Sequence, residues 1–387
     1  MKNIRINIIA LFALTFIVCT SCSHPETNSQ LPATGSECIS QSLLISHAIG
    51  FNIIDHDNYR EVIINEPFKD AVLTRYYLVT DSKVQTPDNG TKLIIPLKHI
   101  GIASCTHIGF MESLDLLDHI SGICLPNSIY SARMQERFEK GEAIDMGDAM
   151  KIDPERALLA NADAIMISGY GQGDVNPERL NKVGIEVIYN NEWTERTPLG
   201  RAEWIKLIGA LFCKDSLANE IFNQVETEYL AASNSQLSTL NSQLSTPSIM
   251  SGNNFRGTWY MSSGDSWTGR LYADAGADYF FKNDSTQGSI PLSIESVLQH
   301  FGDADVWVGS NGHSLEELAQ SDKKHTWFKA YKNHRVYNFY RRQNELGAND
   351  YWERGVVHPE EILKDLIWAL YPEEHTDYQP VYIQQLQ

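Results

Sequence analysis

The sequence predicts an α/β protein of two lobes, each with a small, mainly parallel sheet flanked by helices, joined by one long, rigid α-helix. The chain has 387 residues, more than the roughly 150 typical of one domain. After Leu97, apolar strand-like segments alternate with amphipathic helical segments, as in βαβ units. Apolar residues then recur at helical spacing from Ser216 to Ala232. A helix of that length extends about 25 Å at ~1.5 Å per residue, long enough to join two lobes.

The charge balance excludes one broad class of function. The chain carries 31 Lys and Arg against 49 Asp and Glu, a formal charge of −18. Binding to nucleic acid depends on a basic surface that neutralises phosphates, so a nucleic-acid partner is not expected. With 42% hydrophobic and 21% charged residues, the composition is that of a globular protein.

Residues 1–22 have the pattern of a lipoprotein signal peptide. Lys2 and Arg5 precede an apolar run, Ile8–Val18, that is shorter than the roughly 20 residues needed to span a bilayer. The run ends in a Cys-Thr-Ser-Cys segment that resembles a lipobox, so we expect lipidation of Cys22; a soluble secreted protein is the alternative. Residues 23–37, rich in Ser, Thr, Asn and Pro, read as a flexible tether.

The first lobe is predicted over residues 38–200. Short β-rich runs separated by turn signals occupy residues 39–97. Beyond them, buried strands are predicted at Ile100–Ala103, Ala164–Ile167 and Val187–Tyr189. Helices are predicted between them at Ile108–Leu117 and Pro154–Ala160.

Helices are predicted over residues 201–232, including the helix between the lobes, for which Asp215 is a plausible N-cap. Residues 233–247 contain Asn-Ser-Gln-Leu-Ser-Thr twice in succession. Ser, Thr and Asn form helices poorly, so we interpret this segment as an exposed, low-complexity linker. The second lobe is predicted over residues 248–387.

A second repeat has one copy in each lobe. Ile152–Ile167 and Leu292–Val308 both place a glutamate at a helix start, two apolar residues in the next turn, and Ala-Asp before a strand. The two glutamates are Glu155 and Glu295. The pattern indicates a shared helix-to-strand plan, although this arrangement is also common in unrelated α/β proteins.

Cysteine spacing gives little information. Apart from Cys19 and Cys22, the chain has Cys38, Cys105, Cys124 and Cys213, with no C-x-x-C pair. A disulfide between Cys105 and Cys124 is permitted in an oxidising compartment, and free buried thiols are the equal alternative.

The sequence contains one candidate for nucleophilic catalysis and no clear candidate for a zinc site. Gly264-Asp265-Ser266 resembles the nucleophile block of GDS-type esterases, with His325 as the base of an Asp-x-x-His motif. In such enzymes the serine lies near the start of the catalytic domain, whereas here only about 120 residues follow Ser266. The histidines show no metal-binding spacing such as H-E-x-x-H. We therefore expect no enzyme, no bound metal of the protein itself and no cofactor.

Loops rich in aromatic residues and arginine are the best candidates for ligand binding. They lie at Asn190–Glu195, Asn254–Tyr260, Ser266-Trp267, Tyr340–Arg342 and Asn349–Trp352. Aromatic rings supply contact area, and arginine forks recognise carboxylates and similar anions. Open α/β sheets bind ligands at the carboxyl ends of their strands, where several of these loops are predicted. The pattern indicates a cleft for a bulky anionic or conjugated ligand.

From about Leu97 to Tyr371 the chain resembles the substrate-binding proteins of iron-siderophore, haem and vitamin B12 importers. The resemblance rests on the order of several segments. They are Ile102–His107, Gly147–Asp163, Gly184–Val187, Pro198–Tyr229, Asp274–Gly276 and Lys332–Tyr337.

The resemblance implies a lipid-anchored protein on the periplasmic side of the cell envelope, a monomer that delivers a metal chelate to an ABC permease. The ligand would be an iron-siderophore or related chelate, with cobalamin or haem as alternatives, and Tyr170 or Tyr260 conceivable as a haem ligand. By position, the implied contacts are Thr106, His107, Tyr170, Glu192, Trp193, Arg256, Trp259, Tyr260, Arg341 and Trp352. Trp193 and Trp259 are expected to share one crevice. Glu155 and Glu295 are the implied docking residues for the permease.

Overall fold

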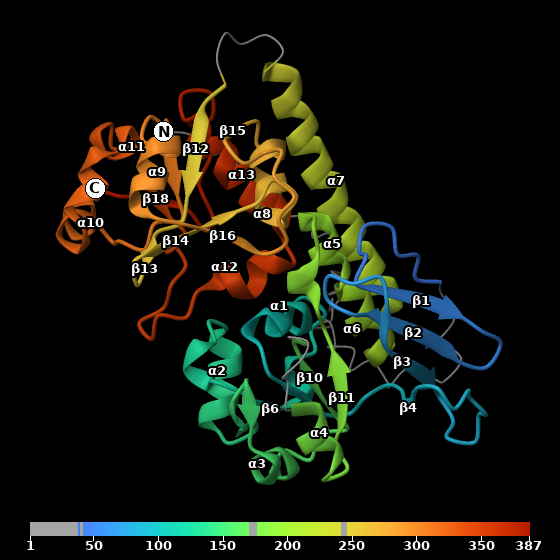
Figure 1. The fold of residues 1–387 in the computed structure, drawn as a ribbon. Helices are drawn as coiled ribbons and strands as arrows, with labels where there is room; N and C mark the ends of the chain where they lie inside the picture. The colour runs from blue at the N-terminus through green and yellow to red at the C-terminus, as the bar shows by residue number, and fades with distance from the viewer. Residues whose placement is uncertain (1–37, 39–41, 170–175, 241–245) are drawn as a thin grey trace, which may run out of the picture. The chain divides into compact units, whose positions relative to one another are not determined.

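A five-stranded parallel sheet forms the centre of the first lobe (Figure 1). The computed structural model describes residue 38 and residues 42–169, 176–240 and 246–387. The strand order of this sheet is β11-β10-β5-β6-β7. The strands are β5 (Ile100–Ile102), β6 (Ile120–Ile123), β7 (Ile144–Asp145), β10 (Ala164–Ile167) and β11 (Glu186–Tyr189). The lobe's helices are α1 (Cys105–Ser113), α2 (Ala132–Glu139), α3 (Pro154–Leu159) and α4 (Asn176–Asn181), and β8 (Gly147–Asp148) pairs with β9 (Lys151–Ile152).

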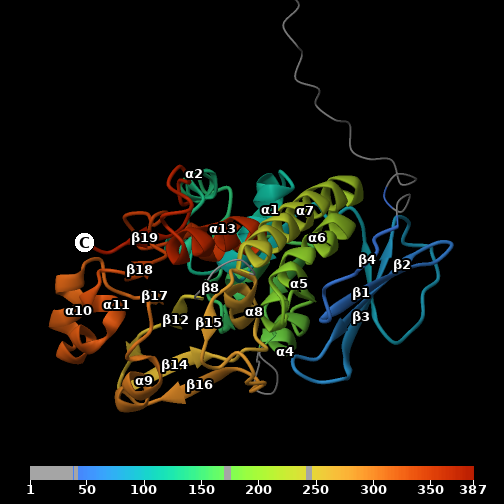
Figure 2. The same ribbon diagram turned by 90° about the horizontal axis from the view of Figure 1, so that it is seen from above.

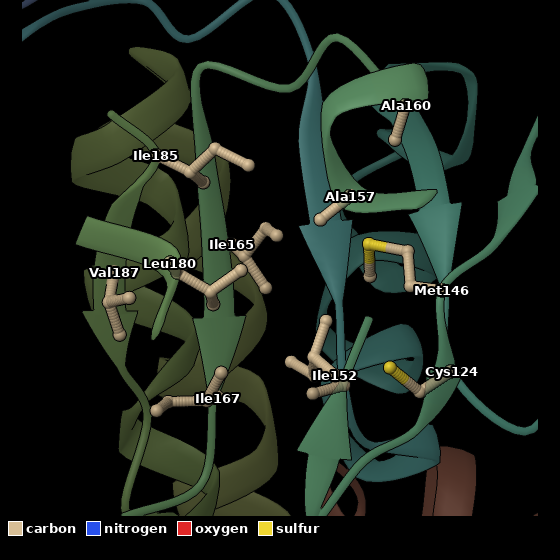
Figure 3. Packing of buried hydrophobic residues seen from close by; sticks show 11 residues of the cluster. Cys124, Met146, Ile152, Ala157, Ala160, Ile165, Ile167, Leu180, Ile185 and Val187 are labelled. Carbon is tan, nitrogen blue, oxygen red and sulfur yellow. The ribbon is translucent and has the colours of Figure 1, made fainter. Parts of the chain in front are cut away.

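The core of this lobe explains why its strands could be predicted. β5 and β10 are buried along their whole length, as expected of parallel strands covered on both faces. Figure 3 shows Ile165 and Ile167 of β10 among the buried side chains of this core. Met146, Ile152 and Leu180 belong to the same buried cluster, so α4 and the β8–β9 region cover the sheet. The alternation of apolar strands and helices is therefore confirmed.

A separate four-stranded sheet precedes this core. It comprises β1 (Phe51–Asp55), β2 (Arg60–Asn65), β3 (Val72–Val79) and β4 (Thr91–Ile94), in that order. The Tyr76 hydroxyl donates to the carbonyl of Val187 at 2.9 Å and so ties β3 to β11. The carboxylates of Glu195 and Glu203 accept hydrogen bonds from the backbone N–H groups of residues 46–50. The sheet is thus fastened to the first lobe by buried polar contacts.

The disulfide differs from the one considered from sequence. Cys38 and Cys213 are joined, although they lie 175 positions apart in the chain. Cys105 and Cys124 are free. Cys105 begins α1 and Cys124 follows β6, where it packs in the sheet core, so the alternative of free thiols is the correct one for this pair.

Three helices lead out of the first lobe: α5 (Pro198–Glu203), α6 (Ile205–Phe212) and α7 (Asp215–Leu240). α7 packs against α6 of the first lobe and against α8 and α13 of the second, so it joins the lobes as predicted (Figure 2). It continues to Leu240, past the predicted end at Ala232, so the interpretation of residues 233–240 as linker is wrong. Ser233 and Gln236 are buried on this last stretch, which indicates that tertiary packing outweighs their weak helix propensity. Residues 241–245 lie outside the described part.

The second lobe has a three-stranded parallel sheet in the order β15-β12-β17. Its strands are β12 (Ser248–Ser251), β15 (Asp278–Tyr279) and β17 (Val306–Val308). Beside it are an antiparallel sheet of β13 (Asn254–Phe255), β14 (Thr258–Ser262) and β16 (Ser289–Leu292), and a pair formed by β18 (Tyr337–Asn338) and β19 (Gln384–Gln385). The helices are α8 (Trp267–Asp274), α9 (Ile294–Phe301), α10 (Leu315–Ser321), α11 (Lys329–Lys332), α12 (Asp350–Glu353) and α13 (Pro359–Leu370).

The two-copy repeat has the predicted geometry. α3 leads to β10 in the first lobe, and α9 leads to β17 in the second. Each helix begins after a side-chain cap, Asp153 for α3 and Ser293 for α9, and each carries its glutamate in the first turn. Among the described residues, no helix combines the length and hydropathy needed to cross a bilayer.

Candidate ligand site between the lobes

The lobes touch where α12 meets α1 and the start of α2. Glu353, the last residue of α12, accepts hydrogen bonds from the backbone N–H groups of Tyr130 at 2.7 Å and Ser131 at 2.9 Å. A Cβ atom on Gly109 of α1 would lie 2.0 Å from the carbonyl oxygen of Glu353, so only glycine permits this approach. Burial raises the pKa of Glu353 to about 8. This contact holds the lobes together beside α7.

A cavity of about 690 Å³ adjoins this contact. The first lobe contributes residues of α1 and of the segment that leads into α2: Gly109, Glu112, Ser113, Tyr130, Ser131, Ala132 and Arg133. α7 contributes Ile221, Gln224, Val225 and Glu228. The second lobe contributes Arg342, Asp350, Arg354, His358, Glu360 and Glu361. A volume of 300–1,000 Å³ is typical of small-molecule sites, and this one draws its walls from both lobes and the connecting helix.

Most charges in the cavity wall are paired. Arg342 Nε lies 2.6 Å from Asp350, and Arg354 forms a two-pronged ion pair with Glu361. Burial would raise the pKa of Glu361, but Arg354 outweighs it and holds that pKa below its usual value. Lys364, just outside the wall, pairs with Glu228 at 2.6 Å. Arg133 pairs with the surface residues Asp115 and Asp118.

A second polar cluster lies at the carboxyl edge of the first sheet. Glu192 follows β11 and is 1% exposed. Its Oε2 accepts hydrogen bonds from Arg201 Nε at 2.7 Å and from Arg201 Nη2 at 2.5 Å. The Arg201 guanidinium stacks on the ring of Trp267 at 4.3 Å. Trp352 lines a narrow crevice with Arg201 and Trp267. The structure therefore brings Glu192 and Trp352 together through Arg201, with the charges neutralised.

Two predicted ligand residues are core residues instead. Trp259 is fully buried, donates its indole N–H to the Ser251 carbonyl at 2.8 Å, and packs against Trp307 at 5.5 Å between ring centroids. His107 is also fully buried, and burial lowers its pKa to about 4, so the imidazole is neutral. Both predictions are wrong, because the aromatic and imidazole groups fill lobe interiors.

Trp193 and Trp259 consequently share no crevice. Trp193 is half-buried and meets Phe68, from the turn between β2 and β3, edge to face at 5.6 Å. Trp259 has no exposed surface from which to approach it. The expectation that these two tryptophans face one ligand is wrong.

The other predicted contacts are exposed or partly exposed and lie outside the 690 Å³ cavity. Arg256 occupies the turn between β13 and β14 with a φ of 52°, and its guanidinium covers Phe255. Tyr260 on β14 is 49% exposed, and Arg341 is exposed. Thr106 is partly buried beside the Ser104 hydroxyl, 2.9 Å away. Tyr170 lies outside the described residues.

Sequence reasoning missed the residues that do line the cavity. Arg342 and Asp350 stood in the aromatic and arginine-rich loops but were not chosen. Asp350, Arg354 and His358 are spaced four residues apart, a one-face helical pattern that could have marked them. Glu112 and Tyr130 carry no such signal, because only the tertiary fold brings them opposite the second lobe.

The docking candidates lie on the surface of their lobes. Glu155 is exposed on α3, next to the exposed Leu158 and Leu159. Glu295 is exposed on α9 and forms an ion pair with Lys324 at 2.6 Å, which holds the pKa of Glu295 below its usual value.

The hydrolase pair is not assembled. The Ser266 hydroxyl donates to the Ser263 carbonyl and caps α8 by accepting from Gly269. His325 is buried, with Nδ1 at 2.9 Å from the Leu318 carbonyl, and its ring packs on Trp259 and Trp307. Each side chain has a structural role, so the esterase alternative is wrong.

Comparisons with known proteins agree with the two-lobed fold. The chain is 25% identical over 302 residues to an uncharacterized lipoprotein of Methanocaldococcus jannaschii, covering 76% of this chain and 69% of that protein. A periplasmic heme binding protein from Pseudomonas aeruginosa superposes with a TM-score of 0.56 at 13% identity, covering 75% of this chain and 98% of that one. A possible iron-binding (periplasmic solute-binding) protein from Staphylococcus epidermidis superposes with a TM-score of 0.53 at 18% identity. That match covers 71% of this chain and 99% of that one.

The family model described as periplasmic binding protein matches residues 112–340, more than half of the chain. This match spans much of both lobes, α7 and most of the residues that line the cavity. The description of this family is that of binding proteins. The chain belongs to the periplasmic binding protein family, the solute-binding class of ABC transporters.

Proposed function

We propose that this protein is the lipid-anchored binding component of an ABC importer and that it captures an iron-siderophore or related metal chelate in the cavity between its lobes. The observation that carries the proposal is the cavity of about 690 Å³, lined by both lobes and α7, in a member of this family. The domain limits inferred from sequence belong to the proposal, with a signal peptide over residues 1–22 and a tether over residues 23–37. The lipoprotein relative from M. jannaschii supports the anchor at Cys22.

The wall chemistry favours a polar chelate over haem. A porphyrin presents two broad apolar faces, which need aromatic or aliphatic walls. Here the apolar contribution is small, chiefly Ile221, Val225 and the ring of Tyr130, whereas carboxylates and arginines occupy most of the wall. A chelate with amide and hydroxyl groups at its periphery can hydrogen-bond to such a surface. Cobalamin is a much larger ligand and would enter only if the lobes moved apart.

Calorimetric titration of the full-length protein in detergent tests the proposal. The probes are a ferric hydroxamate, haem and cyanocobalamin. We expect saturable binding of the hydroxamate and at least tenfold weaker binding in Tyr130→Ala, while the matched control Tyr260→Ala retains wild-type affinity. No binding of any of the three probes would overturn the proposal.

Delivery is proposed to use Glu155 and Glu295, one from each lobe, as contacts to the permease. Both are exposed, and Glu155 is flanked by exposed leucines that suit a protein interface. Glu295 would have to exchange Lys324 for a basic group of the permease. Replacing both with alanine should abolish uptake of the iron chelate and leave its affinity unchanged. Glu139→Ala with Glu316→Ala, exposed carboxylates of the same two lobes, is the control; normal uptake by the Glu155 and Glu295 double variant would contradict the docking role.

A further inference from the structure

We propose that the cavity selects a positively charged chelate, one that carries a protonated amine, over neutral or anionic chelates. This inference rests on the proposed function and adds the charge class of the ligand. It reverses the preference for anions that arginine-rich loops had indicated from sequence.

Each arginine of the cavity wall already has a carboxylate partner. Arg342 is bound to Asp350, and Arg354 is bound to Glu361 through both carboxylate oxygens. Arg133 is held by surface aspartates. Arg256 and Arg341, the other arginines considered from sequence, do not line the cavity. An anionic ligand would therefore meet guanidinium groups that already have a carboxylate beside them.

Among the described residues, two carboxylates of the cavity wall, one from each lobe, have no lysine or arginine partner. Glu360, on α13, is 5% exposed. Among the described residues, its Oε1 is paired with His358 Nδ1 at 2.9 Å, and its Oε2 has no hydrogen-bond partner. Within the described ranges, Glu112 on α1 accepts a hydrogen bond from the Ser131 hydroxyl alone, at 2.9 Å. In the described part of the chain neither carboxylate forms an ion pair with Lys or Arg. A buried carboxylate oxygen without a partner is costly, and a ligand N–H donor would remove that cost.

Glu360 lies at the N-terminus of α13 and on the cavity wall. It stands in the first turn of α13, a 12-residue helix, where the helix dipole favours negative charge. It also lines the cavity directly. The Glu360 carboxylate and the helix N-terminus therefore act on the same part of the cavity.

A protonated amine suits this site better than a bare metal ion. His358, Glu360 and Glu361 offer ligand atoms within 4.8 Å of one another, which could hold a metal. However, Glu361 is already held by Arg354 and by the Tyr382 hydroxyl at 2.8 Å. Only His358 and Glu360 remain, too few ligands for a protein-held metal. An ammonium group needs acceptors alone, and the cavity has room for the chelate to which it is attached.

A matched pair of ligands isolates the charge. Ferrioxamine B is a ferric hydroxamate with one protonated amine, and its N-acetylated form lacks only that charge. Calorimetry on the full-length protein in detergent should give at least tenfold tighter binding of ferrioxamine B. Glu360→Gln, which keeps the shape of the side chain, should reduce the ratio of the two affinities to less than threefold. Glu112→Gln should give a ratio between that of Glu360→Gln and that of wild type. Glu139→Gln is the control and should leave the ratio unchanged.

The outcomes separate the two proposals. Equal affinities for the two chelates, or an unchanged preference in folded Glu360→Gln, would overturn the charge preference and leave the proposed function standing. If neither chelate binds, and haem and cyanocobalamin also fail, the proposed function is wrong and the charge preference falls with it. Circular dichroism confirms that each variant is folded.

Discussion

Glu192 and Glu360 are both buried carboxylates near the contact between the lobes, yet their surroundings are opposite. Glu192 receives two hydrogen bonds from Arg201, which is itself covered by Trp267. Glu360 has one oxygen bound to His358 and one without a partner, and it faces a cavity. Glu192 was predicted to touch the ligand, and Glu360 was not. Burial alone therefore does not identify a binding residue. What distinguishes Glu360 is a carboxylate oxygen that has no hydrogen-bond partner among the described residues.

The largest expected effect comes from breaking the Glu192 cluster. Arg201→Met leaves the Glu192 carboxylate buried without its counter-charge, which should lower the free energy of unfolding by about 3–5 kcal/mol. The double variant Glu192→Gln/Arg201→Met should recover most of that loss. Urea denaturation measures both. Glu360→Gln should change stability by less than about 1 kcal/mol, because the glutamine keeps an oxygen for His358 and the lost helix-terminal charge is worth little. Equal losses in Arg201→Met and Glu360→Gln would contradict the comparison.

The tryptophans provide a second contrast of similar size. Trp259→Ala removes a fully buried ring from the core of the second lobe and should cost about 3–5 kcal/mol. Trp352 is 48% exposed, so Trp352→Ala should cost about 0.5 kcal/mol. Thermal or urea unfolding distinguishes them, and a Trp259→Ala variant as stable as wild type would contradict the core assignment.

The lobe contact should make stability depend on pH. Burial raises the pKa of Glu353 from its ordinary value of 4.5 to about 8. Between these values the folded protein keeps a proton that the unfolded chain has lost. The free energy of unfolding should therefore decrease as pH rises from about 4.5 to 8, by up to about 1.4 kcal/mol per pH unit. Glu353→Gln should flatten this pH dependence. If the free energy of unfolding of that variant fell with pH as steeply as in wild type, the dependence would come from other groups.

The smallest expected effects are at the exposed arginines. Arg256→Ala and Arg341→Ala should each leave affinity for the ferric chelate within about twofold of wild type, since neither lines the cavity. Calorimetry measures this directly. A tenfold loss in either variant would move the ligand out of the cavity and towards the loops predicted from sequence.

Local patterns were sufficient to predict most of the fold. The apolar run Ala164–Ile167 is β10 at the predicted bounds, and the helical spacing after Asp215 is the helix that joins the lobes. These features depend on neighbours in sequence. The end of α7 was missed because Ser233 and Gln236 gain from tertiary contacts that the sequence does not display.

The candidate site was harder to predict because three distant stretches of the chain build it. Residues 109–133, 221–228 and 342–361 meet only in the folded protein. An aromatic residue such as Trp259 serves equally well in a core or a binding wall, so composition could not assign it. The Cys38–Cys213 disulfide, which joins residues 175 positions apart, was likewise outside the reach of spacing arguments.

A crystal structure of the protein with ferrioxamine B bound tests the central claim most directly. We predict the chelate in the cavity between Tyr130 and Glu360, with its amine within hydrogen-bonding distance of the Glu360 carboxylate. Density for the chelate beside Trp193 or Arg256, with the cavity between the lobes unfilled, would contradict the claim.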